Sequence, residues 1–286
     1  MQAASNGSPR SASVVDSKGI QFLQWCLPRL GLRWRGFRKV RRRVYKGIAR
    51  RIRDLGLSGL PAYRAYLDTH AAEWSLLDGL CRIPISRFYR DRGVFQCLEE
   101  EILPELGRLA AARGDSELAC WSIGCASGEE PYTLAIVWRL GPGLWFPGLR
   151  LCVLATDVDP EGLARARRGW YSRSSLKDLP PAYFEQAFAP IGQGWGLGEV
   201  YRDGVTFAEQ DIRRTAPSGP FHLVLCRDVA FTYFDEDRQR DVLRTIVERL
   251  VPGGALVVGS GESLPDGVAA LEVWPARTRV YRRGPS

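Results

Sequence analysis

The stretch WSIGCASGEEPYTLA, from Trp121 to Ala135, decides the fold of this chain. The short apolar run that leads into it predicts a strand, and Gly124 and Gly128 predict a tight turn, because glycine adopts backbone conformations that other residues avoid. Pro131 marks the start of a helix, since proline is well tolerated in the first helical turn. A strand, a glycine turn and a helix in this order indicate a nucleotide-type cofactor site in a parallel sheet, although such a turn alone is often purely structural.

Two acids, Glu129 and Glu130, follow the turn and narrow the chemistry of the ligand. Because the N-terminus of a helix attracts anions, two carboxylates there should repel a pyrophosphate and favour a cation or a sugar hydroxyl. S-adenosylmethionine carries a sulfonium, an ammonium group and a ribose, and it has no phosphate. The stretch is therefore better suited to S-adenosylmethionine than to a dinucleotide.

Apolar runs and amphipathic stretches alternate from residue 118 onward, which is typical of a parallel α/β sheet. We expect strands near 118–123, 151–156, 205–207, 221–226, 255–259, 269–274 and 278–281. We expect helices over 130–140, 160–168 and 235–250. Seven strands that end in a hairpin form the arrangement of class I methyltransferases, a Rossmann-like fold.

Polar residues follow the second and third strands at the end where ligands bind in open α/β sheets. Asp157 is placed to bind ribose hydroxyls, and it is equally suited to cap the next helix. Asp211 and Ile212 offer an acceptor beside an apolar face, which suits the edge of an adenine ring.

The fourth strand ends in Arg227, Asp228 and Val229, and an aromatic pair follows it. Tyr233 and Phe234 are candidates to line the site around the reacting methyl group. Plainer interpretations remain open: Arg227 as an ion-pair partner inside the fold, and the aromatic pair as core.

Composition excludes several classes of protein. The chain has no run of 18 apolar residues, so we expect no membrane insertion. Its seven cysteines are odd in number and contain no CxxC motif, which together with a polar N-terminus predicts a reduced, cytoplasmic protein. With only two histidines, a metal site is not expected.

The chain divides into four segments by pattern and charge. We expect a disordered tail over 1–16, a basic all-helical domain over 17–80, a linker over 81–96 and the α/β domain over 97–286, with a short insertion near 190–204. The net charge of +8 is concentrated at the start, because residues 1–57 hold fourteen Lys or Arg and two acids. This segment predicts an acidic partner surface; a solvated charged face or nucleic-acid binding are the alternatives.

Taken together, these segments resemble the CheR family, chemotaxis receptor methyltransferases that methylate glutamate side chains with S-adenosylmethionine. The matching pieces follow the family order and span most of residues 18–265: SRFYRDRGVF, WSIGCASGEEPYTLAI, LATDVDPEGLARARRGWY, LPPAYFEQAF, FHLVLCRDVAFTYFD and LVPGGALVVGSGESL. The resemblance implies a protein-glutamate O-methyltransferase that leaves S-adenosylhomocysteine as product. It also implies a chemoreceptor cytoplasmic domain as partner, docked beside the basic N-terminal helix.

The resemblance assigns the site residue by residue. Arg90 and Tyr233 would face the substrate carboxylate. One of Glu129 and Glu130 would hold the methionine portion of the cofactor, and we favour Glu129. The residues implied to hold the cofactor are then Ser86, Arg90, Gly124, Glu129, Asp157, Asp211, Ile212, Asp228 and Val229.

Three departures from the family pattern bear on the substrate. The family usually has asparagine where Asp228 stands, and threonine and asparagine where the linker here has Ile83, Pro84 and Ser86. The segment 230–234 is one residue longer than usual, which affects the assignment of Tyr233. A methyltransferase for another protein or a small carboxylate, or a cofactor-binding scaffold, is the alternative function.

Overall fold

The computed structural model describes residues 10–266, 270–275 and 279–285. The chain forms two compact units. The smaller comprises Met1–Ile83 and Thr232–Asp235, and the larger comprises Pro84–Phe231 and Glu236–Ser286. The unit boundary between Ile83 and Pro84 falls within the segment expected to be a linker.

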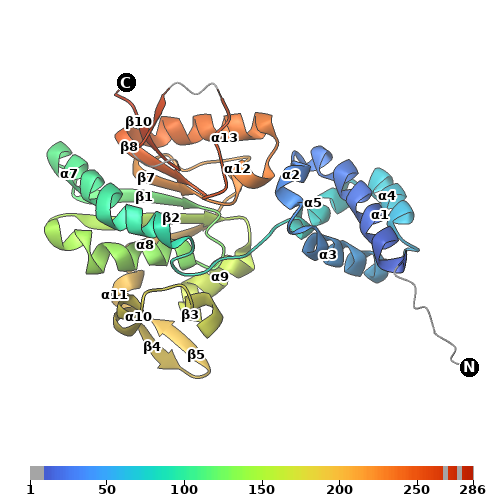
Figure 1. Cartoon of the computed structure of the whole chain (residues 1–286), viewed down its shortest axis with the longest axis horizontal. Coiled ribbons are helices and arrows are strands. Elements are labelled where there is room, and N and C mark those ends of the chain that lie inside the picture. The colour runs from blue at the N-terminus through green and yellow to red at the C-terminus, as the bar shows by residue number, and fades with distance from the viewer. Residues whose placement is uncertain (1–9, 267–269, 276–278, 286) are drawn as a thin grey trace, which may run out of the picture. The chain divides into compact units, whose positions relative to one another are not determined.

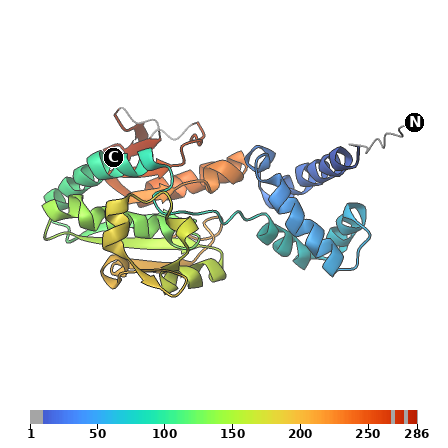
Figure 2. The same ribbon diagram turned by 60° about the horizontal axis from the view of Figure 1, so that its bottom comes forward.

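Helices build the smaller unit (Figures 1 and 2). They are α1 (Arg10–Cys26), η1 (Pro28–Leu30), α2 (Trp34–Phe37), α3 (Arg41–Asp54), α4 (Leu60–Thr69) and α5 (Ala71–Leu80). Helix α1 begins inside the segment expected to be a disordered tail, because the sequence from Arg10 to Lys18 holds no proline or glycine. Residues 1–9 of that tail lie outside the described residues.

Helix α3 has the amphipathic pattern that its sequence predicts. Val44, Ile48 and Ile52 recur every four residues and are buried. The neighbouring helix α5 contributes a buried acid, Glu73, whose carboxylate accepts two hydrogen bonds from Arg51 at 2.9 and 2.8 Å. This bidentate pair links α3 to α5 inside the unit.

A seven-stranded sheet forms the centre of the larger unit, in the order β6-β2-β1-β7-β8-β10-β9 (Figure 1). Strands β6, β2, β1, β7 and β8 run parallel, and β10 is antiparallel to β8 and β9. The bounds are β1 (Glu117–Ile123), β2 (Arg150–Asp157), β6 (Val205–Glu209), β7 (Phe221–Cys226), β8 (Leu250–Val258), β9 (Leu271–Val273) and β10 (Val280–Arg283). The sheet confirms the predicted class I arrangement, including the closing antiparallel strands.

The strand order places a switch point between β1 and β7, because the chain builds β2 and β6 on one side of β1 and β7 and β8 on the other. Ligands bind at such a point, outside the carboxyl ends of the strands. All six residues of β7 are buried, as expected for a strand covered on both faces. The surrounding helices are α6 (Arg92–Cys97), η2 (Leu98–Ile102), α7 (Leu103–Arg113), α8 (Glu129–Leu140), η3 (Pro142–Trp145), α9 (Pro160–Arg168), α12 (Ala230–Tyr233) and α13 (Glu236–Arg249).

A second, three-stranded antiparallel sheet lies apart from the main one (Figure 1). Its elements are β3 (Trp170–Tyr171), η4 (Arg173–Leu176), α10 (Pro181–Ala187), β4 (Phe188–Ile191), β5 (Gly194–Leu197) and α11 (Glu199–Arg202). The insertion is therefore larger than the expected 190–204, since its first strand starts at Trp170. Strand β3 has only two residues and pairs with β5 across more than twenty positions, so local periodicity gives no sign of it.

The glycine turn after β1 has the tight geometry that its sequence predicts. Gly124 and Gly128 have φ of 74° and 89°, in the left-handed region. The Gly124 N–H donates to the carbonyl oxygen of Thr156 at 2.8 Å, which ties the turn to the end of β2. A Cβ on residue 124 would lie 2.3 Å from Cγ2 of Val229, so the turn also depends on close approach to the segment after β7.

We expect Gly124→Ala to lower the free energy of unfolding by about 3 kcal/mol, because it adds backbone strain and a clash. Gly114→Ala is the matched control, since Gly114 has a φ of 75° and open space around its Cβ position. That variant should lose only about 1 kcal/mol from strain. Urea unfolding monitored by tryptophan fluorescence gives both values, and equal losses would show that the contact with Val229 imposes no constraint.

Candidate active site

The turn after β1 is fastened to the end of β2 by Asp157. The carboxylate of Asp157 accepts hydrogen bonds from the backbone N–H groups of Ala126 at 2.8 Å and Asp159 at 2.9 Å. Burial raises the pKa of Asp157, and these N–H groups oppose the rise. The alternative role as a helix cap falls to Asp159 instead, whose side chain accepts from the N–H of Glu161 at the start of α9.

Glu129, the first residue of α8, has a buried and incompletely paired carboxylate. It is 5% exposed, and its Oε2 has no hydrogen-bond partner among the described residues. The Ser86 side chain is close enough to the Glu129 carboxylate to oppose the rise of its pKa, which brings the linker to the turn. Burial raises the pKa of Glu129 above its ordinary value. A cation bound at Oε2 would satisfy this carboxylate, so the residues present fit a ligand with an ammonium group.

The linker crosses the larger unit as a strap that several elements hold. Arg87 pairs with Asp178 at 2.7 Å, and the N–H of Phe88 donates to the carbonyl oxygen of Ser175 at 2.9 Å. These two contacts anchor the strap to η4 and to the loop that follows it. The N–H of Tyr89 then donates to Oγ1 of Thr133 on α8 at 3.0 Å.

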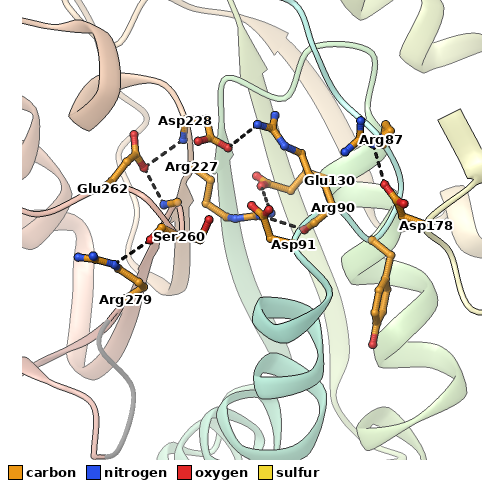
Figure 3. A network of polar contacts seen from close by, with 12 residues as sticks. Arg87, Arg90, Asp91, Glu130, Asp178, Arg227, Asp228, Ser260, Glu262 and Arg279 are labelled. Carbon is orange, nitrogen blue, oxygen red and sulfur yellow. Dashed lines mark hydrogen bonds and ion pairs between the residues drawn. The ribbon is translucent and has the colours of Figure 1, made fainter. Parts of the chain in front are cut away.

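Arg227 fixes the far end of the strap (Figure 3). Its side chain is 3% exposed, and its guanidinium donates to Oε2 of Glu130 at 3.0 Å, Oδ2 of Asp91 at 2.8 Å and the carbonyl oxygen of Arg90 at 2.9 Å. Burial raises the pKa of Glu130, and the Arg227 charge opposes that rise. The interpretation of Arg227 as an ion-pair partner inside the fold is confirmed, while the identity of its partners was missed.

Arg90 and Asp228 meet at the end of β7. Nη2 of Arg90 lies 3.1 Å from Oδ2 of Asp228, and Figure 3 shows the two side chains pointing toward each other. The backbone N–H of Asp228 donates to Oε2 of Glu262 at 3.0 Å. Sequence reasoning brought neither Glu262 nor Asp91 into the site, because the site residues that they contact, Asp228 and Arg227, are distant from them in sequence.

Asp211 follows β6 and already has a partner. Both of its carboxylate oxygens accept from the guanidinium of Arg213, at distances from 2.8 to 3.1 Å, and Oδ1 also accepts the Arg213 N–H. Burial would raise the pKa of Asp211, but the bonds from Arg213 hold it below its ordinary value. The adjacent Ile212 is partly exposed. The expected acceptor for an adenine ring is thus occupied within its own turn.

Tyr233 and Phe234 belong to the smaller unit. The ring of Tyr233 packs on Phe37 with centroids 5.0 Å apart, and its carbonyl oxygen accepts from the N–H of Arg33 at 2.8 Å. Phe234 is 7% exposed, in agreement with its interpretation as core. The role of Tyr233 toward a substrate stays a prediction.

Neither a metal-binding cluster nor a membrane-spanning helix occurs within residues 10–266, 270–275 and 279–285. No group of three or more His, Cys, Asp or Glu side chains gathers there as a metal-binding cluster. No helix within these ranges has the length and apolar character needed to cross a membrane.

Residues 85–280 match a family model described as CheR methyltransferase, SAM binding domain. This match confirms the cofactor that the glycine turn predicts, S-adenosylmethionine. The chain is 33% identical over 233 residues to the chemotaxis protein methyltransferase of Escherichia coli, covering 77% of this chain and 76% of that one. It is 32% identical over 227 residues to a probable chemotaxis protein methyltransferase of Rhizobium etli, covering 77% and 83%.

A third relative is an uncharacterized 104.1 kDa protein of Rhodobacter capsulatus, 31% identical over 242 residues. The match covers 82% of this chain and 25% of that relative, so the chain spans about a quarter of the length of the Rhodobacter protein. With the family model covering its α/β unit, this chain belongs to the CheR methyltransferase family.

Proposed function

We propose that this protein transfers a methyl group from S-adenosylmethionine to glutamate side chains of chemoreceptor cytoplasmic helices. The observation that carries the proposal is the linker strap, which holds Arg90 at the end of β7 and Ser86 on the Glu129 carboxylate. One strap thus connects a residue suited to a substrate carboxylate with a residue suited to the cofactor. Membership in the CheR family supports the same reaction.

The proposed reaction does not require the protein to supply a general base. A glutamate side chain is deprotonated at neutral pH, so its oxygen attacks the methyl carbon without a general base. Bound S-adenosylmethionine would supply the methyl group on a sulfonium and leave as S-adenosylhomocysteine. The task of the residues is to align the carboxylate with the methyl group and to exclude water.

Arg90 is the residue that we assign to the substrate carboxylate. A guanidinium matches a carboxylate with parallel hydrogen bonds, and the Arg90 side chain is 31% exposed and thus accessible. Its backbone is fixed by the bond from Arg227 to its carbonyl oxygen. Tyr233, from the segment after β7, is the second residue that we assign to the substrate side by resemblance.

The cofactor residues are assigned by resemblance to the family and, for Glu129, by its unpartnered oxygen as well. We assign the ammonium group to Glu129 and the ribose hydroxyls to Asp157, whose pKa values are both raised by burial. The adenine ring is assigned to the surface of Ile212 and Asp211. Val229 and Asp228 would lie beside the methyl group, because Val229 contacts the glycine turn.

An exposed basic stripe on α3 is the surface that we assign to the receptor. Its members are spaced so that they share one face of the helix: Arg42, Arg43, Lys46, Arg50 and Arg53. The opposite face is buried in the helical unit. Acidic receptor helices would complement this stripe.

The cysteines support a location in the reducing cytoplasm, because all seven are free and six of them are buried.

Incubation with labelled S-adenosylmethionine and receptor cytoplasmic fragments tests the reaction. We expect base-labile label on the receptor, as a glutamyl ester requires. Arg90→Ala should slow transfer by about 10²-fold if it aligns the carboxylate. Cofactor binding without transfer to any receptor fragment would instead favour a cofactor-binding scaffold, and label on another protein or a small acid would favour the alternative substrate.

Glu129→Gln tests the cofactor assignment. The variant keeps the shape and removes the charge, so S-adenosylmethionine should bind about tenfold more weakly or worse. Wild-type affinity should also fall as the pH is lowered through the raised pKa of Glu129, because protonation removes the partner of the ammonium group. Glu129→Gln should lack this pH dependence. Calorimetry measures both, with the exposed Glu100→Gln as control; a wild-type affinity independent of acid pH would contradict the assignment.

Reversal of the basic stripe tests the partner surface. Lys46→Glu with Arg50→Glu should raise KM for a receptor fragment about tenfold at low salt and leave kcat unchanged, because rim charges act on encounter. High salt should reduce the difference by screening. Arg108→Glu with Arg139→Glu reverses two exposed arginines of the larger unit and serves as control. Equal KM values for both double variants would assign the stripe to solvent.

A further inference from the structure

Arg90, the residue assigned to the substrate carboxylate, already has a carboxylate partner within the chain. Its Nη2 lies 3.1 Å from Oδ2 of Asp228 (Figure 3), and its Nη1 donates to the carbonyl oxygen of Ile85 at 2.9 Å. The two side chains are 31% and 30% exposed, so a ligand can reach the pair. An incoming carboxylate therefore meets a guanidinium whose two terminal nitrogens are both engaged.

Asp228 is the firmly held member of the pair. Its φ of 56° lies in the left-handed region, and its N–H donates to Oε2 of the buried Glu262. The same oxygen accepts from the N–H of Gly259 at 2.6 Å, so one carboxylate supports two backbone segments. A Cβ on residue 259 would lie 2.9 Å from Oδ1 of Asp228, so a larger residue than Gly259 would clash with the Asp228 side chain.

The charge of Asp228, rather than its shape, separates this site from one with asparagine. An asparagine is nearly isosteric, but it would leave Arg90 without a charged partner. When a substrate carboxylate takes Nη2, Asp228 is left beside it as a like charge in a partly buried position. When a substrate carboxylate binds Arg90, it therefore replaces Asp228 as the partner and is repelled by the Asp228 charge. The binding free energy is smaller than an unpaired arginine would provide.

We propose that Asp228 is a specificity-determining residue that competes with the substrate carboxylate for Arg90. The inference rests on the proposed function and deepens it. Asp228 weakens the binding of a glutamate side chain, and it leaves a neutral glutamine in the same place unaffected, since glutamine does not form an ion pair with Arg90. The chain therefore discriminates between the two residues less strongly than it would with an uncharged side chain at position 228.

Asp228→Asn in the full chain tests the proposal against two receptor fragments that carry Glu or Gln at the target position. Calorimetry is performed with S-adenosylhomocysteine present, so that the comparison does not depend on turnover. We expect the variant to bind the Glu fragment about fivefold more tightly than wild type does, since a partly exposed ion pair is worth about that much. Affinity for the Gln fragment should stay the same.

Two variants control for effects other than charge at this place. Asp228→Glu keeps the charge and should give no gain for the Glu fragment. Asp178→Asn removes the carboxylate partner of the neighbouring strap arginine, Arg87, whose pair is similarly exposed, and it should give no gain either. Thermal melting of all three variants confirms that each is folded.

The outcomes separate this inference from the proposed function. Equal affinity of wild type and Asp228→Asn for the Glu fragment, or equal tightening toward both fragments, would overturn the competition. A gain in Asp228→Glu or Asp178→Asn would overturn it as well. The proposed function has a separate test. If it is wrong, receptor fragments incubated with the wild-type protein and labelled S-adenosylmethionine will carry no base-labile label.

Discussion

The rest of the site depends on the hydrogen bonds and ion pairs of one buried guanidinium, that of Arg227. It lies at the end of the central strand β7 and donates to the helix after the glycine turn through Glu130 and to the linker through Asp91 and the carbonyl oxygen of Arg90. A charge that is 3% exposed must be compensated where it lies, since removal of one partner of a buried pair typically costs 3–5 kcal/mol. The linker, helix α8 and the sheet are therefore fixed to one another at a single point, and the position of Arg90 follows from it.

The strap also explains how a loop holds its shape without regular secondary structure. Tyr89 and Asp91 both have φ in the left-handed region, at 56° and 61°. Such strain persists only where the surroundings impose it. Here the bond to Thr133 on one side and the Arg227 network on the other supply that constraint. Side chains on the strap are consequently presented at defined places, which alignment of a carboxylate with a methyl group requires.

Much of the fold is readable from local patterns, and much of the site is not. The strand 221–226 and the helix 160–168 have the same bounds in the structure as in the sequence prediction, because apolar runs and capping residues are local signals. The partners of Arg227 lie 97 and 136 residues away, and no periodicity connects them. Asp211 is the instructive exception: Arg213 stands two residues on, so its pairing was within reach of sequence reasoning.

The acids after Gly128 acquire a physical meaning from these contacts. Glu130 is paired with Arg227 and Asp228 with Arg90, so these two carboxylates are compensated within the chain. Among the residues that the structure describes, Asp157 accepts from two backbone N–H groups, and Glu129 has one oxygen without a hydrogen-bond partner. Burial raises the pKa of Glu129 and Asp157, which means that each pays in free energy to stay ionised. A cation bound beside Glu129 would lower that cost and a phosphate would increase it, so we propose that these acids favour S-adenosylmethionine over a phosphorylated cofactor.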